Sequence, residues 1–287
     1  MAIVISQDGS VKNKLLSLLS AFSTFVGAIQ PPGEVVVTGG RYYAGNVFGQ
    51  HDYAAHINIT LTSFRIMRVE VNYWLYSDVH EWALKRGYAF SVGCNGAAYE
   101  DCLPADTENG AHPVSSVKWS DAIIFANALS ENTGLRPVYL NKKGVPARES
   151  SCYEFTQDAR ANGYRLPTAE EWQVAARGGK AGPENTSYGF RFAGSDNAKV
   201  AAWFPDFNNS HFGTTRVKSL RPDALSLYDM SGNVSEWVDA FNTFSGVKMY
   251  YFCGGSFLIH TGSLAGCDMH SSGYALPDTG FRLERKF

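Results

Sequence analysis

The sequence lacks the features that mark several large classes of protein. It has no cluster of lysine and arginine, and its formal net charge is −2, so we expect no general affinity for nucleic acid or for an anionic membrane. It also has no internal repeat and no low-complexity segment. What it does have is 45% hydrophobic residues, 14% aromatic residues and 28 glycines, which is typical of a globular protein with many turns. Its 287 residues suit one large domain or two small ones.

Cysteine is scarce. The five cysteines include no CxxC pair, so neither a disulfide-rich scaffold nor a structural zinc site is expected. Cys94 and Cys102 share a short loop that contains glycine, and they could form a disulfide if their Cα atoms lie close enough. The sequence does not give that distance, so both states of this pair stay open.

No apolar run is long enough and apolar enough to span a bilayer. The nearest is residues 15–29, which follows two lysines and superficially resembles a signal peptide. Serine and threonine interrupt it, however, and no small-residue cleavage site follows, so no clear export signal is present. Its apolar side chains instead fall on one helical face: Leu15, Leu18, Leu19, Phe22, Val26 and Ile29.

We therefore predict an amphipathic helix over residues 13–30 that packs on the domain or forms an oligomer with another subunit. Pro31-Pro32-Gly33 ends it. This divides the chain into an N-terminal helix and linker, residues 1–33, and a single domain, residues 34–287.

Within the domain the pattern predicts a mixture of short strands, helices and loops. Residues 34–37 form a strand, and residues 56–69 alternate apolar and polar residues as one half-buried strand does. Residues 71–85 are predicted to be helical, with Trp74, Leu75, Val79 and Trp82 on a common side. Residues 93–113 are predicted to be loop, as is most of the chain beyond residue 180, where a few strands interrupt it.

Two further helices carry capping signals. The helix over residues 117–133 has Ser120 as its expected N-cap and Gly134 just beyond its C-terminal end. The next helix has Thr168 as N-cap with Glu171 three residues later, which is a capping box, and it ends at Gly178-Gly179.

Five segments resemble, in order, the motifs of one family. They are residues 64–71 (FRIMRVEV), 113–134 (PVSSVKWSDAIIFANALSENTG), 163–178 (GYRLPTAEEWQVAARG), 227–237 (LYDMSGNVSEW), and the closing pair 254–257 (GGSF) and 280–282 (GFR). This order is similar to that of the formylglycine-generating-enzyme, or sulfatase-modifying-factor, superfamily. The resemblance implies an α+β, C-type-lectin-like fold with a small sheet, two main helices and extensive ordered loops.

The resemblance does not extend to the enzyme's thiols. In the family's enzymes two cysteines stand three and eight residues after the serine of the Gly-Gly-Ser motif and hold copper. Here those positions are Ile259 and Leu264, which neither ligate a metal nor act as a redox thiol. Cys253 and Cys267 are out of register with them. We therefore expect no enzyme and no required cofactor, and keep as the alternative a metal-dependent oxidase with displaced ligands.

Two other metals were considered through the same resemblance. An iron-dependent branch uses three histidines on an additional helical domain for which this chain has no room, and scattered histidines are more often structural. Family members often hold a structural calcium at the loop equivalent to Asn233 and Glu236, and another near Asn197. The equally weighted alternative is that Asn233 and Glu236 bond to donors in a buried turn.

The C-terminal segment keeps the family's residues at both ends, with mixed residues between. This resembles variable proteins of diversity-generating retroelements, some of which use this scaffold, and places a variable region at about residues 253–283. The predicted ligand-binding residues are Phe257, Leu258, Ile259, His260, Ser263, Leu264, Asp268, Met269, His270, Ser272, Tyr274 and Leu276.

Three hypotheses follow. The first is a non-catalytic binding protein with a diversified surface, whose partner is a protein or cell-surface ligand and which is displayed on a cell or virion. The second is the metalloenzyme with displaced ligands. The third is an accessory module of a larger assembly, suggested by the N-terminal helix. The alternative to a binding surface at the C-terminal segment is an ordinary loop that covers the core.

Overall fold

The computed structural model describes most of the predicted domain. The described residues are 29–44, 57–151, 154–184, 189–205, 212–259, 266–271 and 274–287. The predicted N-terminal helix lies almost wholly outside them. Of that segment Ile29 and Gln30 are described, and neither is helical. The Ile29 amide donates to Asn132 Oδ1 at 2.9 Å, and its side chain packs on the core. No helix in the described part of the chain is long and apolar enough to cross a membrane.

One four-stranded sheet joins the two ends of the domain. Its strand order is β1 (Glu34–Val37), β4 (Phe64–Met67), β16 (Glu284–Lys286) and β11 (Tyr164–Arg165). All three pairings are antiparallel, so the last strand of the chain lies between two strands from its first two thirds. The prediction of β1 is confirmed.

The single strand predicted over residues 56–69 is wrong. The chain forms two strands there: β3 (Ile57–Leu61) pairs with β2 (Gly40–Ala44), while β4 pairs with β1. The break has a local cause. The amide of Gly39 donates to Ser63 Oγ at 2.8 Å, and a Cβ at Gly39 would lie 2.8 Å from the Ser63 amide nitrogen. The segments at Gly39 and Ser63 bend at the same point. The alternation of apolar and polar residues gives no sign of this bend.

The two main helices pack against each other. In α1 (Tyr73–Leu84) Asn72 caps the N-terminus by accepting from the Leu75 amide at 3.0 Å. Leu75 and Val79 are buried as predicted, but Trp74 is 54% exposed, so the predicted common side is wrong at Trp74. The helix faces the core through a narrower stripe than the sequence pattern indicated.

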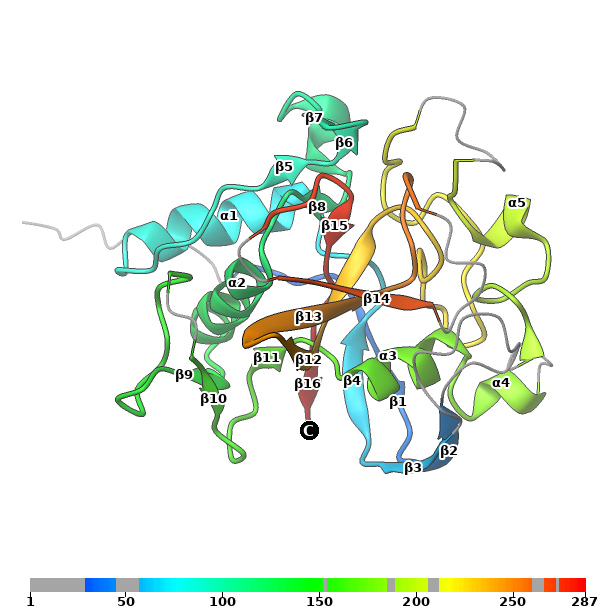
Figure 1. The fold of residues 1–287 in the computed structure, drawn as a ribbon, viewed down its shortest axis with the longest axis horizontal. Coiled ribbons are helices and arrows are strands. Elements are labelled where there is room, and N and C mark those ends of the chain that lie inside the picture. Colours follow the sequence, from blue (N-terminus) through cyan, green and yellow to red (C-terminus); the bar gives the residue numbers. More distant parts are fainter. Residues whose placement is uncertain are drawn as a thin grey trace, which may run out of the picture.

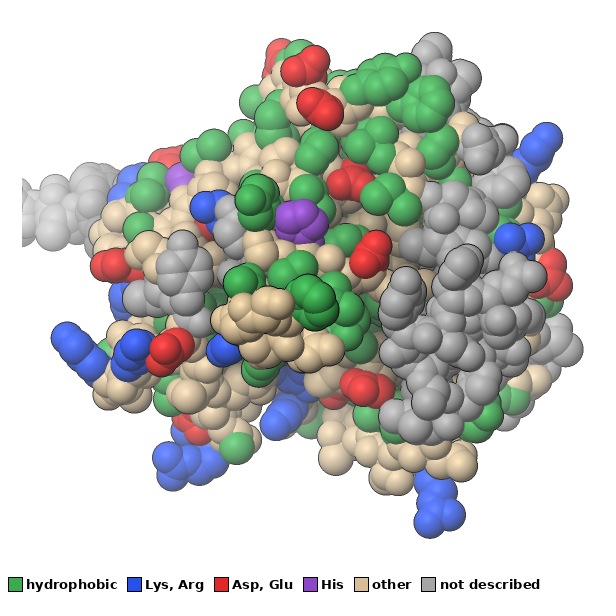
Figure 2. All heavy atoms as spheres, viewed as in Figure 1, with side chains coloured by type: hydrophobic (Ala, Val, Ile, Leu, Met, Phe, Trp, Pro, Cys, Tyr) green, Lys and Arg blue, Asp and Glu red, His purple; other side chains and the backbone are tan. Residues whose placement is uncertain are grey.

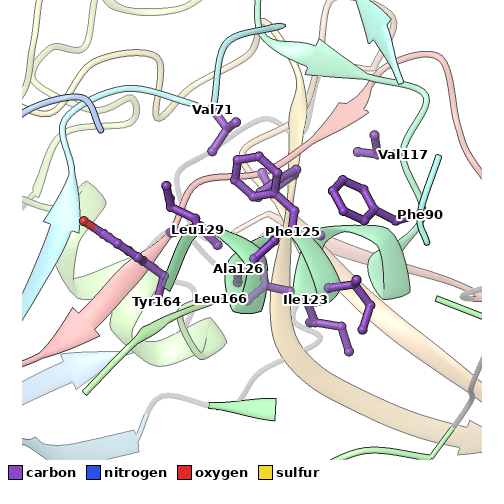
Figure 3. Close-up of a cluster of buried hydrophobic side chains, with 14 of the residues drawn as sticks. Val71, Phe90, Val117, Ile123, Phe125, Ala126, Leu129, Tyr164 and Leu166 are labelled. Atoms are coloured by element: carbon purple, nitrogen blue, oxygen red, sulfur yellow. The ribbon is translucent and has the colours of Figure 1, made fainter. Parts of the chain in front are cut away.

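The second main helix, α2 (Trp119–Asn132), is buried along nearly all of its length (Figure 3). Its N-cap is Lys118, not Ser120 as predicted, because the Asp121 carboxylate accepts from the Lys118 amide at 3.1 Å and fixes the start two residues earlier. Gly134 adopts φ +75°, which confirms its predicted place after the helix.

The capping box of α3 (Ala169–Ala176) is confirmed. Thr168 Oγ1 accepts from the Glu171 amide at 3.2 Å, and Glu171 Oε2 accepts from the Thr168 amide at 2.8 Å. The remaining short elements are β5 (Cys94–Asn95), β6 (Ala97–Ala98), β7 (Asp101–Cys102), η1 (Thr107–Gly110), β8 (Val114–Ser115), β9 (Tyr139–Leu140), β10 (Thr156–Gln157), α4 (Ala181–Glu184) and α5 (Ala198–Ala201).

A second four-stranded sheet crosses the middle of the molecule (Figure 1). Its order is β14 (Cys267–Ser271), β13 (Val247–Cys253), β12 (Ser235–Phe244) and β15 (Thr279–Gly280). Trp237, Tyr250 and Phe252 belong to the hydrophobic cluster around α2, whereas Val238 and Cys253 belong to the cluster around α3. The inner half of this hairpin is thus buried on both faces, and for that reason it lacks the alternation that would have predicted it.

Candidate functional site

The candidate site is built on the pairing of β13 with β14. The two strands are antiparallel, with Cys253 opposite Cys267 and Tyr250 opposite His270. Cys253 and Cys267 form a disulfide, and so do Cys94 and Cys102, which settles the pairing that the sequence left open. The Cys253–Cys267 pair was not predicted, because fourteen residues separate the two cysteines and only the strand register brings them together.

The Gly-Gly-Ser motif turns the chain over the core at the end of β13. Gly254 has φ +96°, and a Cβ there would lie 3.1 Å from the Trp172 ring, so glycine is required for this close approach. Ser256 Oγ donates to Asp278 Oδ2 at 2.5 Å and accepts from the amides of Leu258 and Ile259. Burial raises the pKa of Asp278 above its usual value. These bonds fix the start of the candidate segment.

The structure divides the predicted binding residues at this turn. The prediction that Phe257 is a displayed side chain is wrong: Phe257 is 0% exposed, and its amide donates to the Asn233 carbonyl at 2.8 Å. An aromatic ring in a loop can anchor that loop to the core, which a single sequence does not distinguish from display. Leu258 is half-buried, and Ile259 is 49% exposed.

A second group of predicted residues lies on or after β14. Tyr274 is 62% exposed, and its ring meets the His270 ring edge to face with centroids 4.9 Å apart. Asp268 is exposed and Met269 half-buried. Leu276 is half-buried and packs on the core around α2. His260, Ser263, Leu264 and Ser272 lie outside the described residues.

The residues predicted to hold calcium have other partners. Glu236 accepts from Trp172 Nε1 at 2.7 Å and from both Nε and Nη2 of Arg282, at 2.7 and 2.6 Å. Asn233 accepts from the Thr215 amide at 2.9 Å and donates to Glu70 Oε2 at 2.8 Å. A calcium ion at Glu236 would have to compete with a guanidinium. The contacts of Asn233 and Glu236 therefore fit the alternative of a buried turn, and the donor set does not fit calcium there.

Asn197, the third predicted ligand, is exposed and has a local role. Its side chain caps α5 by accepting from the Lys199 amide at 3.1 Å, and no described contact joins it to Asn233 or Glu236. Among the residues that the structure describes, no group of three His, Cys, Asp or Glu side chains is arranged to hold a metal ion. Calcium near Asn197 stays a prediction.

Glu236 and Arg282 belong to a buried ionic cluster beneath the site. Glu70 and Asp229 are the other members, and all four side chains are almost wholly inaccessible. Burial, with the neighbouring carboxylates, raises the pKa of Glu70 well above its usual range and that of Asp229 to about 6. Arg282 also donates to the carbonyls of Met67 and Tyr228. The cluster thus joins four separate segments of the chain and acts as a structural link.

One exposed apolar group was not predicted. Phe241, Phe244 and Val247 lie on the outer end of the β12–β13 hairpin, and they are 54%, 73% and 52% exposed. The usable signal was the aromatic residues flanking Ser245-Gly246, a turn sequence between two apolar runs.

Ile259 is exposed at the position where the family resemblance would place a thiolate ligand, and Cys253 and Cys267 are oxidised to each other. What the site presents is an apolar side chain, a phenol, an imidazole and a carboxylate on a segment held at Ser256 and at the disulfide.

Comparisons with known proteins agree with this fold. The model of the family "Sulfatase-modifying factor enzyme 1-like domain" matches residues 22–287. The chaperone protein LppX of Paenibacillus barcinonensis is 30% identical over 240 residues, which cover 76% of this chain and 75% of the relative. The inactive C-alpha-formylglycine-generating enzyme 2 of Mus musculus is 26% identical over 255 residues, covering 85% and 80%.

Two solved structures extend the comparison. The crystal structure of CarF has a TM-score of 0.84 and 50% sequence identity, and the match covers 90% of this chain and 99% of CarF. Treponema denticola variable protein 1 has a TM-score of 0.68 and 24% identity, covering 88% and 95%. The predicted α+β, C-type-lectin-like fold of the formylglycine-generating-enzyme type is thereby confirmed.

Proposed function

Because the chain belongs to the sulfatase-modifying factor enzyme 1-like domain family, we propose that it is a member without catalysis, a protein that binds a protein or cell-surface ligand through its C-terminal surface. The observation that carries this proposal is the state of the thiols. Ile259 occupies a ligand position of the enzymes, and Cys253 is bonded to Cys267 beside it. The inactive mouse relative supports the same direction.

The exposed residues support a binding role. Ile259 and Tyr274 present apolar and aromatic area, which is the chemistry of interface hot spots. The described parts of the segment are tied to the fold by the Ser256–Asp278 hydrogen bond and by the Cys253–Cys267 disulfide, which lowers the conformational entropy that these parts lose on binding.

The finer part of the proposal is that this surface is diversified by a retroelement, and that the protein is displayed on a cell or virion. Adenine-directed changes at the first two positions of asparagine codons give codons that end in a pyrimidine, and such codons never encode Lys, Gln, Glu, Met or Trp. Residues 257–279 contain none of these except Met269, which is itself one of the predicted binding residues, so that position does not arise in this way. The similarity in fold to a variable protein is consistent with this origin.

The first test is the DNA beside the gene. A near-copy of the 3′ coding end that differs at template adenines, in codons for positions such as 259, 268 and 274, would support diversification. If no such copy exists, the retroelement part of the proposal is wrong while the binding part stands.

Binding and catalysis are tested on the protein. Peptides selected from a displayed random library should lose about tenfold in affinity for Ile259→Ala and Tyr274→Ala but not for Val145→Ala, an equally exposed control elsewhere. Added copper or iron should produce no oxygen uptake with a cysteine-containing peptide beyond that of the metal alone. Oxygen uptake with loss of the peptide thiol would establish the oxidase alternative.

A second candidate function is that of an accessory protein that keeps a client folded, which the match to chaperone protein LppX favours. The full chain should then suppress the aggregation of a denatured client at stoichiometric amounts. Failure to do so with several unrelated clients would remove this candidate.

A further inference from the structure

Two exposed aromatic side chains lie together at one end of the molecule. Tyr99 and Phe212 are 57% and 36% exposed, and their ring centroids are 5.3 Å apart at an interplanar angle of 31°. They come from distant parts of the chain, the turn between β6 and β7 and the segment that pairs with β6. Figure 1 places β6 and β7 at the edge of the fold, above β5 and β8.

Both residues have backbone conformations that aromatic residues rarely adopt. Tyr99 has φ +52° and Phe212 has φ +46°, the left-handed region in which glycine and asparagine are usual. A turn that needed only to reverse the chain would be more stable with either of those residues. Of the ten described non-glycine residues with positive φ, these two alone are aromatic. Because strain of this kind often occurs at functional sites, the two exposed rings suggest a role beyond reversing the chain.

The surrounding structure holds the pair rigidly. The Tyr99 amide donates to the Phe212 carbonyl at 2.8 Å, and the Thr214 amide donates to the Ala97 carbonyl at 2.8 Å. The Cys94–Cys102 disulfide closes the loop that contains Tyr99. Asn95 Nδ2 donates to three backbone carbonyls of residues 104–107. These bonds hold together the two backbone segments from which the rings project.

The charge around the pair is negative. Glu100 and Asp101 follow Tyr99 directly and are exposed, as is Asp106. Residues 95–112 and 212–215 contain no lysine or arginine, and Arg216 is paired with Glu108 at 3.6 Å. Figure 2 shows acidic and hydrophobic side chains gathered at this end of the molecule.

We propose that Tyr99 and Phe212 form a docking surface for a partner protein that presents arginine. A guanidinium stacks on an aromatic face and at the same time bonds to a carboxylate, which is the combination that Tyr99 and its acidic neighbours offer. This surface, Tyr99, Phe212, Glu100 and Asp101, is separate from the C-terminal segment and does not depend on the function proposed for it. It provides a second contact for the same protein.

The test uses the full chain and a fluorescein-labelled peptide of alternating arginine and glycine, with fluorescence anisotropy as the measurement. Tyr99→Gly and Phe212→Gly remove the rings and suit the positive φ angles, so both variants should fold. Each should weaken binding by about tenfold. Glu100→Gln with Asp101→Asn should weaken binding and reduce its dependence on salt.

The matched control is Phe244→Ala, which removes an aromatic side chain that is 73% exposed on the β12–β13 hairpin and should leave the affinity within about twofold. Three outcomes would overturn the proposal. They are an equal loss of affinity in the Phe244→Ala control, no binding of the arginine peptide, and equal binding of a glutamine–glycine peptide. Binding of a neutral oligosaccharide that is lost in Tyr99→Gly would overturn it as well, because the rings would then serve a sugar.

Discussion

Asp223 is a residue at which burial couples the stability of the fold to pH. Its Oδ1 accepts from the amides of Leu225 and Leu227, both at 2.8 Å, while burial raises its pKa to about 7. The unfolded chain has the ordinary value near 3.9, so between about pH 4 and pH 7 the folded protein binds more protons than the unfolded chain. The free energy of unfolding therefore falls as pH rises through this range.

Asp223→Asn should remove that dependence, because the amide oxygen can still accept both bonds and the side chain has no proton to lose. In urea unfolding, the free energy of unfolding of the variant minus that of the wild type should rise by on the order of 2 kcal/mol from pH 5 to pH 8. The control Asp106→Asn changes an exposed aspartate, and its free energy of unfolding should vary with pH as that of the wild type does. A variant curve parallel to the wild type at every pH would show that Asp223 does not titrate in this way.

Single residues also show which contacts can be predicted from the sequence. The contacts of Thr168 and Glu171 were predicted because both partners lie within one turn of a helix. The burial of Phe257 and the pairing of Cys253 with Cys267 were not, since each depends on segments that are distant in sequence. Which side chains after Ser256 face outward depends on the turn at Ser256, and the sequence does not show that turn.

At the level of elements, the Cys253–Cys267 disulfide connects β14 to β13 across a long loop. The pair closes a loop with a sequence separation of 14, for which the loss of chain entropy in the unfolded state corresponds to about 3 kcal/mol. Cys253→Ala with Cys267→Ala should lower the free energy of urea unfolding by about that amount and speed hydrogen exchange of the β14 amides.

Thiol titration is the control for this change. Four of the five cysteines are in disulfides. The wild-type protein denatured without a reductant should therefore show one reactive thiol, and five after reduction. Labelling of Cys253 or Cys267 without reduction, or an unchanged unfolding midpoint in the double variant, would contradict a structural role for this disulfide.

Helices and strands were predicted where local sequence signals determine them. They were missed where pairing with a distant strand determines them. The helices α2 and α3 have apolar periodicity and caps, so their positions followed from the sequence. The β12–β13 hairpin is buried on both faces at its inner end, and residues 57–67 change partner in mid-course from β2 to β1. In both places the decisive contact is with a strand remote in sequence, and no local period records it.

The whole molecule is closed by its C-terminal residues, which explains why the family motifs at both ends of the chain occur together. β16 completes the first sheet between β4 and β11. Arg282, two residues before β16, bonds to Glu236 and to the carbonyls of Met67 and Tyr228. Order along the chain was enough to recognise the fold class. The physical link between the motifs is the buried ionic cluster, which no single motif discloses.

Arg282→Met is the change that tests this closure. It leaves Glu236, Glu70 and Asp229 buried without their cation, and loss of one partner from a buried pair costs about 3–5 kcal/mol. The double variant Arg282→Met/Glu236→Gln should lose less than the sum of the two single losses, because the uncompensated charge is removed with its partner. Lys85→Met, which breaks an exposed pair with Glu81, should change little. Urea unfolding of the wild type, the two single variants, the double variant and Lys85→Met measures these differences. Strictly additive losses in the double variant would mean that Arg282 acts through its bonds to the two carbonyls alone, and that the ionic cluster does not hold the ends of the domain together.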